Sequence, residues 1–263
     1  MRYIDPCNIL NARFEGKERP DWDAVILIFR DARGSAIVKE ALGCRGYGER
    51  VLCGMEAAFT HEMRMNNNKT VGVIEQCIWG GPQISILVEE ISELGIGIAI
   101  GIGACGSTVP RLPKGTQVYA TRSLTTDGTS KMYTSKEFTI PSKGLAQIAE
   151  SLDSKKLSAA TAASVDAVYQ ETKEFVDSLI GLGTEIINME SSAFYAASVV
   201  CNIESLWIGH VSDCISGDKW EEWNNIEDMT RESALVCRDL LARALSETHA
   251  NDAMQPEART SRR

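Results

Sequence analysis

The stretch "KTVGVIEQCIWGGPQISILVEEISELGIGIAIGIGACGS", residues 69–107, decides the fold. It begins and ends with apolar runs, 69–78 and 95–107, whose composition is typical of buried strands. Between these runs the apolar residues recur at helical spacing, and the pattern ends at a glycine: Ile84, Leu87, Val88, Ile91, Leu94 and then Gly95. A strand, a helix and a second strand in this order predict parallel strands joined by a crossover helix.

The same two patterns continue outward from this stretch. Further strands are expected in the runs "DAVILIF" (23–29), "GTQVYATRSLT" (115–125), "KKLSAATAASV" (155–165) and "SLWIGHVSD" (205–213), and helices at 142–152, 172–183 and 226–245. This alternation predicts an α/β fold with three αβα layers around a central, mainly parallel mixed sheet. We divide the chain into an N-terminal extension (1–22), a single domain (23–246) and a mobile tail (247–263) without apolar periodicity.

Composition narrows the class of partner. The net charge of −9 argues against nucleic acid or an anionic membrane, because both require a positively charged surface. No run approaches the roughly 18 apolar residues of a membrane span, and the N-terminus has no secretory pattern. The eight cysteines form no C-x-x-C pair and no metal-like spacing with the three histidines. We therefore expect a cytoplasmic protein with reduced cysteines, no metal, no cofactor and a small-molecule ligand.

Glycines cluster in "IGIGACGS", residues 100–107, directly after an expected strand. In open α/β sheets, ligands bind outside the carboxyl ends of the strands, and glycine lets the backbone approach them closely. Tight packing between strands would need glycines equally, so this motif leaves both interpretations open.

In the segment "EIINMESSAFYAASVV", residues 185–200, Glu190 is an acid in the middle of apolar sequence, near the start of an expected helix. An acid there complements the positive end of the helix dipole, which is the structural explanation. In so apolar a setting, however, an unpaired carboxylate is costly unless it accepts hydrogen bonds. Two adjacent hydroxyl groups of a sugar are suitable donors, so Glu190 is a candidate ligand-binding residue.

Asp213 ends the expected strand 205–213, where an acid is placed either for chemistry or to cap the next element. The loop "GDKWEEWNN" that follows either covers a pocket with Trp220 and Trp223 or packs these rings beneath it. His210, inside the same apolar run, is expected to be a hydrogen-bonded core residue.

Several segments resemble the nucleoside phosphorylase and nucleosidase superfamily, in the order found in that family. They are "WGGPQISILVEEISELGI" (79–96), "IGIGACGSTVPRLPKGTQVYAT" (100–121), "DGTSKMY" (127–133), "NMESSAFYAA" (188–197) and "VSD" (211–213). The resemblance covers roughly residues 23 to 246, and the spaced pair "NMES" and "VSD" is its most specific part. It implies the family's αβα fold and cleavage of an N-glycosidic bond.

The resemblance also implies roles for individual residues. Glu190 would accept the 2′- and 3′-hydroxyls of ribose, with Asn188 and Met189 beside the sugar. Asp213 would protonate the departing base at N7, which favours a purine. The base would be lined by Cys105, Gly106, Val168 and Tyr169, with valine at 168 where the family usually has a stacking aromatic residue.

The phosphate-binding residues of the family are absent from their expected positions. The family has an arginine in the loop after the first strand, and this position falls on Gly34, with Arg33 one residue before it. A second arginine of the family, before the glycine motif, falls on Gly101, and a hydroxyl-bearing phosphate ligand falls on Ala104. An arginine donated by a neighbouring subunit aligns near Ala57. The glutamate that positions water in the nucleosidase branch is also missing, and Asp31 is its nearest substitute.

The sequence therefore predicts an enzyme that cleaves a purine-type nucleoside, with water favoured over phosphate as the acceptor. Two alternatives stay open. Phosphorolysis requires that Arg30 or Arg33, helped by a neighbouring subunit, rebuild the anion site, because phosphate binding depends on charge-assisted contacts. The second alternative is a catalytically silent relative that binds a nucleoside. The resemblance further implies a homodimer or a hexamer.

Overall fold

The computed structural model describes residues 3–46, 60–66, 68–78, 80–153, 156–216, 219–222 and 226–254, without the side chains of Ser216 and of residues 247–254. Four strands form its central parallel sheet: β4 (Thr70–Ile74), β1 (Ala24–Ile28), β5 (Ile98–Ser107) and β10 (Glu204–Ser216), in this spatial order. Their apolar, β-branched sequences suit strands that are covered on both faces.

The segment 69–107 forms β4, the helix α3 (Gly80–Glu93) and β5. The predicted strand, helix and strand are confirmed, and both strands are parallel to β1. They do not pair directly with each other, because β1 lies between them. Helix α3 therefore crosses over one intervening strand, which brings the glycine-rich β5 into the middle of the sheet.

Beyond β5 the sheet closes on itself. β10 pairs with β6 (Gln117–Leu124), β6 with β8 (Ser158–Ser164), β8 with β9 (Ile186–Asn188), and β9 again with β5. We call these five strands, β5, β10, β6, β8 and β9, the strand ring. Antiparallel additions at the margins are β3 (Thr60–Arg64), β2 (Arg45–Gly46), β7 (Phe138–Thr139) and β11 (Lys219–Glu221). The sheet is mixed, with its longest ladder, β5 with β10, parallel.

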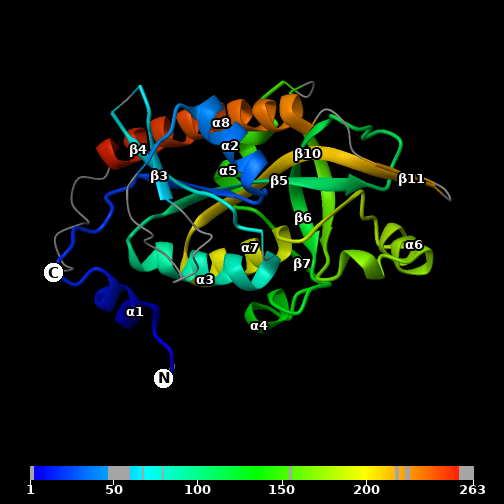
Figure 1. Ribbon diagram of the computed structural model, residues 1–263, viewed down its shortest axis with the longest axis horizontal. Helices are drawn as coiled ribbons and strands as arrows, with labels where there is room; N and C mark the ends of the chain where they lie inside the picture. The colour runs from blue at the N-terminus through cyan, green and yellow to red at the C-terminus, as the bar shows by residue number, and fades with distance from the viewer. Residues whose placement is uncertain are drawn as a thin grey trace.

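Helices cover both faces of the sheet, which confirms the predicted αβα layers (Figure 1). One layer contains α2 (Ala32–Leu42), α5 (Lys143–Glu150) and α8 (Ile226–Met254), and the other α1 (Pro6–Arg13), α3, the short α4 (Ser130–Tyr133) and α7 (Ser191–Cys201). Helix α6 (Lys173–Gly181) packs beside the strand ring through Val176 and Leu179. Among the described helices, none has the length and apolar run needed to cross a membrane.

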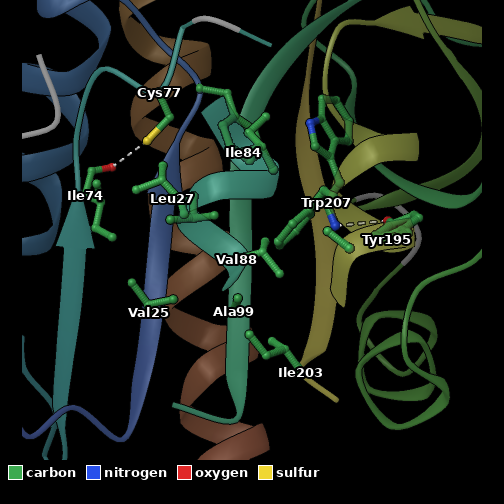
Figure 2. Close-up of a cluster of buried hydrophobic side chains, with 14 of the residues drawn as sticks. Val25, Leu27, Ile74, Cys77, Ile84, Val88, Ala99, Tyr195, Ile203 and Trp207 are labelled. Atoms are coloured by element: carbon green, nitrogen blue, oxygen red, sulfur yellow. Dashed lines mark hydrogen bonds between the residues drawn. The ribbon is translucent and has the colours of Figure 1, made fainter. Parts of the chain in front are cut away.

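The core between the sheet and α3 and α7 is a continuous apolar cluster (Figure 2). Val25 and Leu27 of β1 face Ile84 and Val88 of α3 there. On the α7 side, the hydroxyl oxygen of Tyr195 accepts the backbone N–H of Trp207 at 3.0 Å, which ties α7 to β10. This contact holds α7 against the sheet, and the candidate residues Asn188, Met189 and Glu190 directly precede the helix.

Two features bear on the predicted division of the chain. Leu10, Phe14 and Trp22, all from the predicted extension, are buried in the same cluster as Val25 and Leu27. At the other end, α8 continues to Met254, inside the segment 247–263 that the sequence predicts as a tail. Residues 255–263 lie outside the described residues.

Candidate functional site

A cavity of about 540 Å³ opens near the carboxyl ends of β5 and β10, beside the start of α7. This volume lies within the usual range for small-molecule sites. It brings together nine of the residues that the sequence singles out: Ala104, Cys105, Gly106, Val168, Tyr169, Asn188, Met189, Glu190 and, from β10, Asp213. Residues far apart in the chain thus line one space.

Glu190 lies at the N-cap position of α7, and its side chain is 8% exposed. Its carboxylate accepts the backbone N–H of Met189 at 3.3 Å. The turn itself is held by Asn188, whose Oδ1 accepts the backbone N–H groups of Glu190 and Ser191, both at 3.0 Å. Asn188, rather than Glu190, therefore supplies the side-chain cap of this helix, and the Glu190 carboxylate is available to the cavity.

Burial raises the pKa of Glu190 to about 7, and the N–H of Met189 and the positive charge of Arg30 offset this rise in part. Near neutral pH this acid therefore changes charge readily. A ligand that donates hydrogen bonds to it would favour the carboxylate form.

An irregularity in β10 sets the direction of the Asp213 side chain. The ladder between β10 and β5 shifts register between Val211 and Asp213, and Asp213 then pairs with Gly106. Such bulges re-aim side chains. A methyl group on Gly106 would lie 3.2 Å from Oδ2 of Asp213, so glycine leaves the acid room to face the cavity.

Both oxygens of Asp213 accept hydrogen bonds. The hydroxyl of Ser212 donates to Oδ1 at 2.6 Å, and the indole N–H of Trp220 donates to Oδ2 at 2.9 Å. Trp220 comes from β11 and lines the cavity, so this ring covers the acid as one of the two alternatives for its loop predicts. Trp223, the other tryptophan of that loop, lies outside the described residues.

A third acid, Glu171, lines the cavity between the short 3-10 turn Val168–Gln170 and α6. Burial, and then the charge of Asp213, raise its pKa to about 7. Glu171 could not be identified as a site residue from sequence, because acids are common just before helices and nothing in the sequence links this one to Asp213.

The remaining wall residues differ in exposure. Cys105 is buried, and burial together with Asp213 and Glu190 raises the pKa of its thiol well above the usual value. Val168 and Tyr169 lie at the rim, 53% and 96% exposed. Their side chains can contact a ligand from the solvent side.

The two charged candidates for a phosphate or water site lie elsewhere. The Arg33 guanidinium is exposed and pairs with Glu227 of α8. Asp31 is the N-cap of α2, where its carboxylate accepts the N–H of Gly34 at 2.8 Å. Neither lines the cavity. The position near Ala57 lies outside the described residues.

Neighbouring side chains fill the space at Gly34 and Gly101, the two positions at which the resemblance leads us to expect arginine. A methyl group on Gly101 would lie 2.3 Å from the ring of Phe29, and one on Gly34 would lie 2.7 Å from Cβ and 2.9 Å from Nε of Arg30. Arg30 is largely buried; burial lowers its pKa, and the charges of Asp31 and Glu190 oppose this. Its Nε has no hydrogen-bond partner among the described residues.

His210 is a core residue, as the sequence predicts. It is fully buried, its Nδ1 lies 3.1 Å from the hydroxyl of Ser233, and burial lowers its pKa to about 3. In the described part of the chain, no cluster of three or more acid, histidine or cysteine side chains is arranged to hold a metal ion.

Comparison with known sequences bears directly on this arrangement. The profile of the phosphorylase superfamily matches residues 45–246, which include β5, the start of α7 and β10. The chain belongs to the phosphorylase superfamily. The match confirms the family suggested by the "NMES" and "VSD" motifs, which provide Glu190 and Asp213.

Two known sequences and one solved structure are similar to this chain. An uncharacterised protein of Acanthamoeba polyphaga mimivirus is 30% identical over 56% of this chain and 59% of its own length. A guanosine phosphorylase of Halorubrum lacusprofundi is 29% identical over 54% of this chain and 65% of its own length. The fold also matches futalosine hydrolase of Helicobacter pylori, with a TM-score of 0.68 and 15% identity over 84% of this chain and 98% of that one. The chain therefore aligns with less than two thirds of the length of either sequence relative.

Proposed function

We propose that this protein cleaves the N-glycosidic bond of a purine-type nucleoside, with water as the acceptor. The observation that carries the proposal is the convergence of Glu190 and Asp213 on one cavity of about 540 Å³. Two acids from separate elements can bind the sugar and the leaving base of the same substrate. Membership of the phosphorylase superfamily supports this assignment.

The proposed reaction uses the two acids differently. Glu190, ionised, accepts hydrogen bonds from the 2′- and 3′-hydroxyls and stabilises the positive charge that develops on ribose. Asp213, protonated, donates its proton to N7 as the bond between C1′ and N9 breaks and its electron pair moves onto the base. Water then adds to C1′ and releases a proton to solvent, and the Asp213 carboxylate takes up a proton from solvent after the base has left. General acid assistance of this kind typically contributes about 10²- to 10⁴-fold.

The surroundings of Asp213 set a condition on this step. The hydroxyl of Ser212 and the indole N–H of Trp220 both donate to its carboxylate. Proton donation to N7 therefore requires that the purine displace the indole of Trp220 from Oδ2 of Asp213.

Water is favoured over phosphate because the chain fills the positions that would bind the anion. The ring of Phe29 occupies the space beside Gly101, and Arg33 pairs with Glu227 away from the cavity. Arg30 supports the second candidate, phosphorolysis. It is a largely buried cation whose charge acts on Glu190, and its Nε has no partner among the described residues.

Measuring free base by chromatography after incubation with purine and pyrimidine nucleosides tests both candidates. We expect release of a purine base without phosphate, with ribose as the second product; strict phosphate dependence would establish phosphorolysis. Asp213→Asn should lower kcat by about 10²- to 10⁴-fold. The control Asp239→Asn, on the exposed face of α8, should retain full activity. No release from any nucleoside would contradict the proposal and leave the silent-relative alternative.

A further inference from the structure

A second cavity, of about 280 Å³, adjoins the functional cavity. The two cavities share Glu171, Ile215 and Trp220 in their walls. We call this second space the side cavity. Its volume lies just below the usual range for a complete small-molecule ligand, so it suits one part of a ligand whose remainder occupies the larger cavity.

Apolar side chains from three elements line the side cavity. Helix α6 provides Val176, which is 3% exposed, and Ile180, which is 41% exposed. Ile215 of β10 packs against the same apolar cluster as Val176, and β11 adds the ring of Trp220. These surfaces favour an apolar occupant, because its burial removes apolar area from water on both sides of the contact.

The polar side chains of the side cavity do not call for a charged ligand. The hydroxyl of Thr108 donates to the backbone carbonyl of Thr184 at 3.0 Å. On α6, Nζ of Lys173 lies 3.4 Å from Oδ2 of Asp177, so these opposite charges offset each other. Lys219 of β11 is exposed to solvent. An uncharged group can therefore enter without leaving a buried ion unpaired.

The wall between the two cavities lies beside Asp213. The indole N–H of Trp220 donates to Oδ2 of Asp213 at 2.9 Å. Neither Met189 nor Glu190 lines the side cavity. The side cavity therefore adjoins the end of the site that the proposed function assigns to the base. In a purine, N7 and the group at position 6 lie on the same edge, so a base that presents N7 to Asp213 directs its position-6 group along this wall.

We propose that the side cavity binds an apolar substituent carried on the 6-amino group of a purine nucleoside, in contact with Val176 and Ile180. This inference rests on the proposed function, because it places the base beside Asp213. In that reaction the base displaces the indole of Trp220 from Asp213, and the same movement opens the shared wall.

The acid in the shared wall tolerates such a substituent. Burial, and then the charge of Asp213, raise the pKa of Glu171 to about 7. An apolar group that passes this side chain excludes water and favours its neutral form. Near neutral pH, protonation of Glu171 therefore removes little affinity from the substituted nucleoside.

Titration calorimetry with adenosine and N6-benzyladenosine tests the inference. All titrations use protein with Asp213→Asn, in which the proposed function makes cleavage slow, so that heat reports binding. With the side cavity unaltered, N6-benzyladenosine should bind about 10- to 100-fold more tightly than adenosine, because its added ring leaves water for the apolar walls.

Filling the side cavity separates its role from that of the functional cavity. Ile180→Trp places an indole in the side cavity and should abolish the preference for N6-benzyladenosine while adenosine affinity is retained. Leu182→Trp is the matched control, because Leu182 ends the same helix, is 48% exposed and lines neither cavity. It should keep the full preference. Retained binding of adenosine also shows that each variant is folded.

The outcomes distinguish this inference from the proposed cleavage. Equal affinity for the two nucleosides, or a preference that Ile180→Trp leaves unchanged, would overturn the substituent site. Equal loss of affinity for both in Ile180→Trp would also overturn it, and would show that the side cavity receives the displaced indole of Trp220 instead.

The wild-type chain completes the comparison. A preference that depends on residue 180, without release of base by the wild type, would retain the substituent site and refute the cleavage. Release of adenine by the wild type, without any preference in binding, would do the reverse. Failure to bind either nucleoside would overturn both.

Discussion

Glu190 is a residue whose placement lowers the stability of the folded protein. Its pKa is about 7 in the folded chain and near 4.5 in the unfolded one, so the folded state holds this proton more tightly. Stability therefore falls as pH rises from about 4.5 to 7 and stays reduced above pH 7. The shift corresponds to about 3 kcal/mol.

Glu190→Gln should consequently stabilise the protein at pH 8 while it weakens nucleoside binding. We expect Tm at pH 8 to rise by roughly 5 to 10 °C and Tm at pH 4.5 to change little. Thermal unfolding followed by circular dichroism at both pH values measures this. The control Glu93→Gln, on the exposed side of α3, should leave Tm unchanged at either pH. Equal shifts of Tm at the two pH values would contradict the proposed cause.

Single residues differed in how well sequence could identify them. Glu190 was recognisable because it is an acid directly before an apolar helix, and Asp213 because it ends an apolar run of sequence. Glu171 and the indole of Trp220 were not assigned, since their relation to Asp213 exists only after the chain folds. The charge and sequence position of Arg33 and Asp31 favour a phosphate or water site. In the structure, Arg33 forms a surface ion pair and Asp31 caps a helix.

At the level of elements, the contact between β1 and β5 determines which side chains position 101 can hold. Phe29, directly after β1, packs against the backbone of Gly101 in β5 and edge-on against Phe194 of α7. Any side chain at position 101 must displace that ring. An arginine at position 101 is therefore incompatible with Phe29 in this position.

Gly101→Ala tests this packing. Overpacking in a buried sheet typically costs about 1 to 3 kcal/mol. Adding Phe29→Leu should recover part of that loss, since leucine lacks the ring atoms nearest to residue 101. Urea unfolding of the two single variants and the double variant gives the coupling energy. Gly97→Ala is the control, because no atom outside its chain neighbours lies within 4 Å of the added methyl group. Independent effects of the two substitutions would contradict the model of direct contact.

Elements with strong patterns were predictable, and short ones were not. The strands β1, β4, β5, β6, β8 and β10 and the helices α3, α5, α6 and α8 follow apolar runs or helical periodicity. β9 has three residues, and α2 is rich in small and charged residues, so neither has a distinctive pattern. The bulge that directs Asp213 depends on pairing between β5 and β10, which no local pattern encodes.

For the whole molecule, the structure joins the predicted N-terminal extension to the main core. Leu10 of α1 is fully buried, in the cluster that also contains Ile91 of α3. Residues 1–22 are polar and precede the first expected strand, so the sequence predicts that they lie outside the main domain. Packing against α3 could not be foreseen from that segment alone.

Leu10→Ala should therefore destabilise the entire protein in one transition. Deleting a buried leucine side chain typically costs about 2 to 5 kcal/mol. Urea unfolding monitored by tryptophan fluorescence reports on the core, because Trp207 of β10 is fully buried in the cluster that contains Leu10. Ile4→Ala is the matched control, because Ile4 is 75% exposed. An unchanged transition for Leu10→Ala would show that α1 is an independent appendage.

The strand ring also determines when the cavity can form during synthesis of the chain. β10 closes the ring by pairing with β5 over residues 204 to 214, and it carries Asp213. A nascent chain that ends before β10 leaves that edge of β5 unpaired, with backbone groups open to association with other chains. Synthesis must therefore pass β10 before the two acids can meet. Until then, protection by chaperones matters more for this protein than for one built from local contacts.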